Sequence, residues 1–232
     1  MALGGVGLRV YGVSLIYGIT VCTEAEELKR LLKQIKENLD DPDKIIVQVD
    51  SSNTNQEVSK VVKRFKKELS SSQFYVVEKS LDGDFGKFKN NVLSVARKKG
   101  GDFVFLLDAD EYLSSALMMN LKWYLSINSD VECMLLARAN YYVDLDYYPE
   151  FKKENEGGLD DMGRFLYMDQ KLRIVNLKNS RIKYKGKIHE EIEGCTEKKL
   201  LPVAKGNCWE IIHIKTPKKQ MEQNELYKEL MK

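Results

Sequence analysis

The feature that most constrains the fold is a regular alternation between short apolar runs and amphipathic helical patterns in the first half of the chain. The apolar runs have the length of strands and cover 10–22, 45–49, 74–77 and 103–107. Apolar residues recur at helical spacing over 28–39, 58–69 and 88–97. This alternation predicts an α/β fold with a mostly parallel sheet, right-handed crossovers and helices on both faces.

The second half of the chain has a different pattern. It predicts a helix over 114–127 and short strands over 132–139, 171–176, 181–184, 187–191 and 211–213. The stretch 141–161 is rich in tyrosine and acidic residues and lacks periodicity, which is typical of a binding loop or lid. After Pro217 we expect a charged helix on the surface.

We therefore expect a single domain over 8–232, with residues 1–7 outside the fold. It would consist of a parallel half, 8–113, a smaller mixed half, 114–214, and a C-terminal helix, 215–232.

Charge and composition exclude several classes of protein. Lys plus Arg (37) nearly equals Asp plus Glu (35), so the basic surplus typical of nucleic-acid-binding proteins is absent. The four cysteines have no C-x-x-C spacing, which favours reduced thiols over disulfides or a zinc site. The longest apolar run, 10–22, is interrupted by Gly and Ser and is shorter than the roughly 20 residues that cross a bilayer. We expect a soluble, cytoplasmic protein, or one peripheral to a membrane, and the oligomeric state stays open.

The clearest functional motif is Asp108-Ala109-Asp110, directly after the run 103–107. Side chains at i and i+2 of an extended chain point the same way, so both carboxylates would face one site. Two carboxylates that lie so near each other favour a bound cation, and oxygen ligands suit Mg²⁺ or Mn²⁺. The alternative is a solvated turn or a helix N-cap. Asp50 follows its own strand, where it either forms a turn or accepts hydrogen bonds from a nucleotide.

The chain has two histidines, His189 and His213, and each ends a short apolar stretch. Either can be purely structural. As a functional residue, His213 is a candidate metal ligand beside Asp110, because imidazole suits transition metals. Glu190 is a candidate general base.

Together these residues resemble family 2 of the GT-A inverting glycosyltransferases over 11–214. The resemblance is densest over 85–113, where FGKFKNNVLSVARKKGGDFVFLLDADEYL is similar to the family's Arg-Asn, helix, buried strand and Asp-x-Asp-Glu. The later segments QKLRIVN, YKGKIHEEI and IIHI resemble the branch related to lipopolysaccharide-core transferases. The resemblance implies a GT-A, Rossmann-like fold whose mixed half holds the acceptor.

The resemblance also implies roles for individual residues. The nucleotide sugar would contact Thr20, Thr23, Glu24, Asp50, Lys89, Asn90 and Asp108. Asp110 and His213 would hold Mn²⁺ or Mg²⁺, His189 would face the acceptor, and Glu190 would be the catalytic base, with Glu191 as the next candidate. The chain departs from the family pattern at Cys22-Thr23, where Tyr-Asn is usual, and at Lys89, which replaces an arginine.

The implied reaction is metal-dependent transfer of a sugar from a nucleotide-diphosphate sugar to a hydroxyl of a glycan or lipid-linked glycan, with inversion. Two alternatives stay open, a metal-dependent nucleotidyltransferase and a non-catalytic nucleotide-sugar-binding module. A nucleotidyltransferase normally has a basic, glycine-rich loop after its first strand, whereas this chain has the acidic 23–26.

Overall fold

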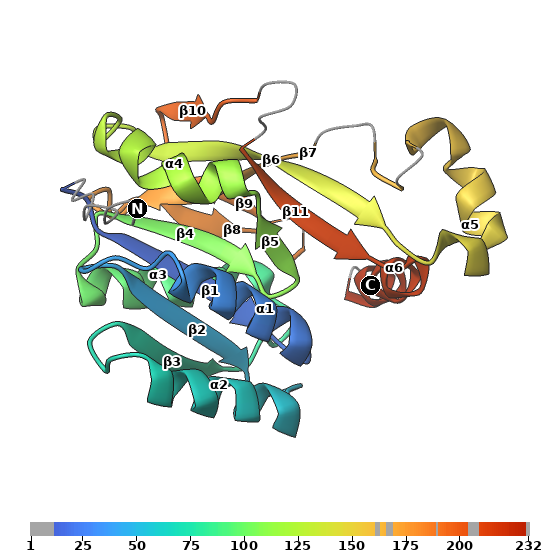
Figure 1. Cartoon of the computed structure of the whole chain (residues 1–232), viewed down its shortest axis with the longest axis horizontal. Coiled ribbons are helices and arrows are strands. Elements are labelled where there is room, and N and C mark those ends of the chain that lie inside the picture. Colours follow the sequence, from blue (N-terminus) through green and yellow to red (C-terminus); the bar gives the residue numbers. More distant parts are fainter. Residues whose placement is uncertain (1–11, 161–162, 166–168, 189, 204–208, 231–232) are drawn as a thin grey trace, which may run out of the picture.

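The computed structural model describes residues 12–160, 163–165, 169–188, 190–203 and 209–230 (Figure 1). The expected leader, 1–7, and His189 lie outside the described residues. Within them, nine strands form one sheet in the order β3-β2-β1-β4-β7-β6-β11-β5, and β10 pairs with β6. The strands are β1 (Leu15–Val21), β2 (Lys44–Asp50), β3 (Phe74–Lys79), β4 (Phe103–Asp108), β5 (Glu111–Leu113), β6 (Cys133–Tyr142), β7 (Asp169–Asn176), β10 (Lys198–Leu200) and β11 (Glu210–Lys215).

The direction of the strands places most of their carboxyl ends at one edge of the sheet. β3, β2, β1 and β4 are parallel to one another. β7 runs antiparallel to both β4 and β6, so β6 regains the direction of β4, and β11 is parallel to β6. The expected α/β fold with a mostly parallel sheet and a mixed second half is therefore confirmed.

Helices cover both faces of the sheet (Figure 1). α1 (Ala25–Lys36), α2 (Gln56–Glu68) and α4 (Ser115–Ser126) share one apolar core with the face that carries Leu15, Tyr17 and Ile19. α3 (Phe85–Lys99) and the hairpin of β8 (Lys183–Lys185) and β9 (Glu191–Glu193) pack on the opposite face. Here Gly18 lets α3 approach closely, because a Cβ at that position would lie 2.5 Å from Val92. None of the described helices is long and apolar enough to span a membrane.

The second half differs from its prediction in three places. The strand expected over 187–191 is β9, which begins only at Glu191. The stretch expected to be a loop contains short helical segments, η1 (Leu145–Tyr147), α5 (Pro149–Glu154) and η2 (Glu156–Gly158). The C-terminal helix, α6 (Pro217–Leu230), does not lie free on the surface, because five of its side chains line a cavity of about 1140 Å³.

Candidate functional site

A cavity of about 1140 Å³ opens at the edge where the carboxyl ends of β1, β2 and β4 meet. Its remaining walls come from β6, β7, β8, β10, β11, Leu81, the start of α3, the segment 190–192 and α6. It is lined by most of the residues singled out in the sequence, namely Thr20, Glu24, Asp50, Lys89, Asp108, Asp110, Glu190, Glu191 and His213. The fold thus brings together residues from both halves of the chain.

Asp108 lies at the centre of a charged network. Its Oδ2 accepts a hydrogen bond from Arg173 Nη2 at 2.7 Å, and its Oδ1 accepts one from the Thr20 hydroxyl at 2.8 Å. Lys89 Nζ lies 3.4 Å from the same Oδ1. Burial would raise the pKa of Asp108, but the Arg173 and Lys89 cations outweigh it and hold the pKa well below its usual range. Asp108 is therefore a carboxylate at every physiological pH.

Asp110 contacts His213 in the lining of the same cavity. Its Oδ2 lies 3.2 Å from His213 Nε2 and 3.3 Å from Lys219 Nζ of α6. Burial would raise the pKa of Asp110, but the hydrogen bond and charge of His213, together with Lys219, lower it below its ordinary value. On the other side of the ring, His213 Nδ1 lies 2.9 Å from Asn140 Oδ1. The contact with Asn140 at Nδ1 fixes the ring so that Nε2 points toward Asp110.

Asp110 and His213 fit two ligands of a divalent cation. Two atoms that each lie about 2.1 Å from an octahedral ion, at a right angle, are about 3 Å apart, which is close to the distance between Oδ2 and Nε2. The contact of Asn140 Oδ1 with His213 Nδ1 fixes the orientation of the ring, as outer partners do for imidazoles that bind metals. No group of three or more metal-binding side chains occurs within the described residues.

Glu190 is held in the cavity by Lys89, whose Nζ lies 2.6 Å from its Oε1. Lys89 is buried in α3 and bridges Glu190 to Asp108, so residues that are distant in sequence share one ammonium group. Glu191 begins β9 and is the more exposed of the two adjacent glutamates. The structure therefore places Glu190 closer to the carboxylate cluster, while both glutamates line the cavity.

At the end of the cavity beside β1 and β2, two carboxylates accept hydrogen bonds from backbone N–H groups. Asp50 is buried, and its Oδ1 accepts hydrogen bonds from the N–H groups of Ser52 and Leu81, each at 3.0 Å. Glu24 accepts from the N–H of Cys22 at 3.0 Å and fixes the turn after β1. Burial raises the pKa of the Cys22 thiol to about 11, so this thiol stays protonated.

Two predicted contact residues lie outside the cavity lining. Thr23 is exposed, and its carbonyl accepts a hydrogen bond from the side chain of Asn55 at 3.0 Å. Asn90 pairs with the backbone of Tyr184 in β8, donating to its carbonyl at 2.8 Å and accepting from its N–H at 2.7 Å. Asn90 therefore joins α3 to the β8–β9 hairpin.

Several lining residues were not identified from the sequence. Arg173 of β7 is almost fully buried and binds both Asp108 and Glu111, the latter at 2.5 Å. Arg138 of β6 and Lys215 of β11 also line the cavity, as does the polar face of α6. The only sign of these residues in the sequence is a charged residue within a strand pattern. Charged residues in strands are usually exposed, so the pattern alone does not indicate a place in a cavity.

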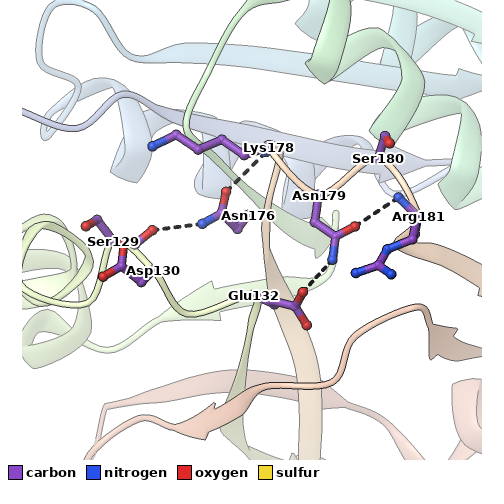
Figure 2. A pocket seen from close by; sticks show the side chains of 8 residues that line it. All are labelled: Ser129, Asp130, Glu132, Asn176, Lys178, Asn179, Ser180 and Arg181. Atoms are coloured by element: carbon purple, nitrogen blue, oxygen red, sulfur yellow. Dashed lines mark hydrogen bonds between the residues drawn. The ribbon is translucent and has the colours of Figure 1, made fainter.

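A second hollow, of about 550 Å³, lies at the other end of β7, around its last residue, Asn176 (Figure 2). Its polar groups are already engaged with one another, since Asn179 donates to Glu132 at 2.6 Å and Glu132 also accepts from the N–H of Thr196 at 2.6 Å. Hydrogen bonds from the N–H groups of Glu197 and Thr196 lower the pKa of Glu132 to about 2. We interpret the hydrogen bonds around this hollow as structural contacts that hold two loops together.

Comparison with known proteins identifies the architecture. No protein-family model and no curated protein sequence matches the chain. The structure of S. aureus TarS matches 90% of this chain and 38% of its own length, with 12% identity and a TM-score of 0.55. The structure of S. aureus TarS 1–349 in complex with UDP matches 92% of this chain and 64% of its own, with 13% identity and a TM-score of 0.53. The fold is of the GT-A type.

The chain therefore spans between 38% and 64% of the length of these TarS structures. Glucosyl-3-phosphoglycerate synthase from Mycobacterium tuberculosis, solved with Mn²⁺, UDP and glucosyl-3-phosphoglycerate, overlaps less well, with a TM-score of 0.48 at 10% identity, over 91% of this chain and 75% of that one. None of these matches supports the expected relation to the lipopolysaccharide-core branch. The two TarS structures show that the chain shares its fold with GT-A structures.

Proposed function

We propose that this chain transfers a sugar from a nucleoside-diphosphate sugar to an acceptor hydroxyl. The observation that carries the proposal is that Asp108 and Asp110, from the parallel half, share one cavity with Glu190 and His213, from the mixed half. A GT-A fold with acidic residues at the carboxyl end of its central strand is suited to bind a nucleotide there. The complex of TarS 1–349 with UDP supports a nucleoside diphosphate as the leaving group.

The nucleotide would bind at the end of the cavity formed by β1 and β2. Asp50 and Glu24 would offer carboxylate oxygens to a base or ribose, and Asp108 lines the same cavity. Thr20 and Arg173 fix the orientation of Asp108, so that its position is set before the substrate arrives. Thr23 and Asn90 would act indirectly, through the loops that they hold.

Asp110 and His213 would hold Mn²⁺ or Mg²⁺. When bound, such an ion neutralises the charge that develops on the departing diphosphate. Asn140 orients His213 for this task through the 2.9 Å contact at Nδ1. Lys219 lies 3.3 Å from Asp110 and contributes a further positive charge on the same side.

Glu190 would take the proton from the attacking hydroxyl. Its contact with Lys89 fixes the carboxylate next to the Asp108 side of the cavity, where the donor sugar would lie. The new bond from the acceptor oxygen forms at the anomeric carbon on the side opposite the leaving diphosphate, which gives inversion. His189, expected to face the acceptor, lies outside the described residues.

The test uses the full chain with Mn²⁺ and a panel of UDP- and GDP-sugars, with release of free nucleoside diphosphate as the readout. Glu190→Gln should lower turnover by about 100-fold or more and leave the affinity for UDP within about twofold, because only the proton acceptor is lost. Glu193→Gln is the matched control, since Glu193 pairs with Lys185 and does not line the cavity.

The other outcomes discriminate between functions. If Glu190→Gln is active and Glu191→Gln is not, the base is Glu191. If neither variant loses turnover, the proposed base is wrong. Release of pyrophosphate would instead indicate a nucleotidyltransferase, and binding of nucleotide sugars without any turnover would indicate a binding module.

A further inference from the structure

The two carboxylates of the Asp108-Ala109-Asp110 motif are neutralised in different ways. Asp108 contacts Arg173 at 2.7 Å, and the side chain of Arg173 is only 5% exposed. Asp110 instead contacts Lys219, in the first turn of α6, at 3.3 Å, and the side chain of Lys219 is 36% exposed. Charge-assisted hydrogen bonds are usually about 2.7–2.9 Å long, so only the contact of Asp108 is a tight one. The cation beside Asp110 is therefore more easily displaced than the cation beside Asp108.

Lys219 has a second carboxylate within reach. Its Nζ lies 3.6 Å from Glu27 Oε1 in the first turn of α1, so one ammonium group bridges α1, α6 and Asp110. The backbone at the start of α6 is held separately, because the N–H of Lys219 donates to the Thr216 hydroxyl at 3.2 Å. A lysine side chain has a flexible four-carbon stem. The ammonium can thus move from Asp110 toward Glu27 while the helix stays in place.

The contact with Lys219 uses the same oxygen that would bind a divalent cation. Lys219 Nζ and His213 Nε2 both lie near Asp110 Oδ2, at 3.3 Å and 3.2 Å. An ion between Oδ2 and Nε2 would lie no more than about 5.4 Å from the ammonium, because it would be about 2.1 Å from the shared oxygen. Like charges at that distance repel even in water-like surroundings. Ion binding and the contact between Lys219 and Asp110 therefore oppose each other.

We propose that Lys219 determines the affinity for the divalent cation, because its ammonium competes with the ion for Asp110 Oδ2 and moves to Glu27 when the ion binds. The inference rests on the proposed function for the ion site itself, formed by Asp110 and His213. Lys219 lies outside the described lining of the cavity, so it acts on the ion through Asp110 and not on a substrate.

This exchange predicts opposite effects for two neighbouring charges. Removal of the ammonium of Lys219 ends the competition and should tighten ion binding. Removal of the carboxylate of Glu27 takes away the second partner of the ammonium, which then stays on Asp110 and weakens ion binding. Because Glu27 also attracts the ion directly, the coupling between Glu27 and Lys219 decides between exchange and simple attraction.

The experiment measures binding of Mn²⁺ alone to the full chain, from the electron paramagnetic resonance signal of the free ion. It compares wild type, Lys219→Met, Glu27→Gln and the double variant. Lys218→Met is the matched control, because it removes the same charge from the adjacent residue of α6, whose side chain is 69% exposed and pairs with Glu222. Thermal unfolding establishes that each variant is folded.

Lys219→Met should bind Mn²⁺ about tenfold or more tightly than wild type, and Lys218→Met should stay within about twofold of wild type. Glu27→Gln should weaken binding by about threefold or more in the wild-type background, and by about 1.5-fold or less in Lys219→Met. Unchanged or weaker binding by Lys219→Met would mean that Lys219 only orients Asp110, which overturns the proposal. An equal effect of Glu27→Gln in both backgrounds also overturns it, because Glu27 then acts on the ion directly.

The assay for sugar transfer separates this inference from the proposed function. Tighter Mn²⁺ binding by Lys219→Met, without turnover of any nucleotide sugar by the wild type, supports the exchange and contradicts sugar transfer. Turnover by a wild type whose Mn²⁺ affinity does not depend on Lys219 contradicts the exchange alone. Absence of Mn²⁺ binding by both wild type and Lys219→Met contradicts the exchange and the proposed ion site together.

Discussion

Replacement of Arg173 by methionine should destabilise the protein strongly. Arg173 is the close partner of Glu111, which is 0% exposed, and their Nη2 and Oε1 atoms are 2.5 Å apart. Without Arg173, the nearest remaining cation to Glu111 is Arg138, at 3.7 Å. Asp108 also loses its 2.7 Å contact, but its side chain is 33% exposed and can regain water. The loss of stability in Arg173→Met should therefore come mainly from Glu111, whose buried charge loses its close partner.

Leaving one buried charge unpaired typically costs about 3–5 kcal/mol. Because domains are usually stable by about 5–15 kcal/mol, Arg173→Met should move the urea midpoint well below that of wild type. Glu111→Gln removes the buried charge that would lack a partner. It keeps an oxygen that can accept from the Asp108 N–H, which in the wild-type protein lies 3.0 Å from Glu111 Oε2. The double variant Glu111→Gln/Arg173→Met should therefore be more stable than Arg173→Met alone.

Urea denaturation of the four proteins in this double-mutant cycle gives the coupling free energy, which we expect to be about 2–3 kcal/mol. Two results would refute the reasoning. One is that Arg173→Met lowers the free energy of unfolding by less than about 1 kcal/mol, which would mean that water or Arg138 replaces Arg173 as the partner of Glu111. The other is simple additivity of the two substitutions.

Three further predictions concern separate parts of the molecule. Hydrogen bonds led by the N–H of Glu197 lower the pKa of Glu132 from 4.5 to about 2, so its stabilising effect is present above pH 4.5 and is lost as the pH falls toward 2. Thermal melts of Glu132→Gln should accordingly converge with wild type in acid. Gly18→Ala should cost about 1–3 kcal/mol in urea unfolding, because the added methyl group meets α3 at 2.5 Å; no change would mean that α3 shifts freely. Asn140→Leu should weaken Mn²⁺ binding with UDP by about tenfold or more, as followed by electron paramagnetic resonance, since it frees His213; equal affinity would argue against this ligand pair.

The elements of the first half could be predicted because their signal is local. The runs 45–49 and 103–107 are buried on both faces in the fold, and that burial is visible as an unbroken apolar sequence. The position of Asp50 and Asp108 followed from the same reasoning, since parallel strands bring their carboxyl ends to one edge of the sheet. Local patterning and strand direction were sufficient for this part of the site.

The rest of the site depends on contacts that no local pattern contains. Arg173 is buried only because β7 runs between β4 and β6 in the reverse direction, and QKLRIVN by itself is equally compatible with an exposed arginine. α6 has polar residues around its whole circumference, so its sequence shows no apolar stripe that would indicate a docked face. It packs through Gln220, Gln223 and Tyr227, whose partners are side chains of other elements.

The reversed strand β7 also has a consequence for the order in which the molecule matures. Asp108 and the arginine that neutralises it are separated by 65 residues, so a growing chain exposes the acidic motif well before its partner leaves the ribosome. Until β7 inserts, the edge of β4 that pairs with β7 is open, and Asp108 lacks its contact with Arg173. Because His213 of β11 and five side chains of α6 also line the cavity, the cavity is complete only after these later elements have packed against the sheet.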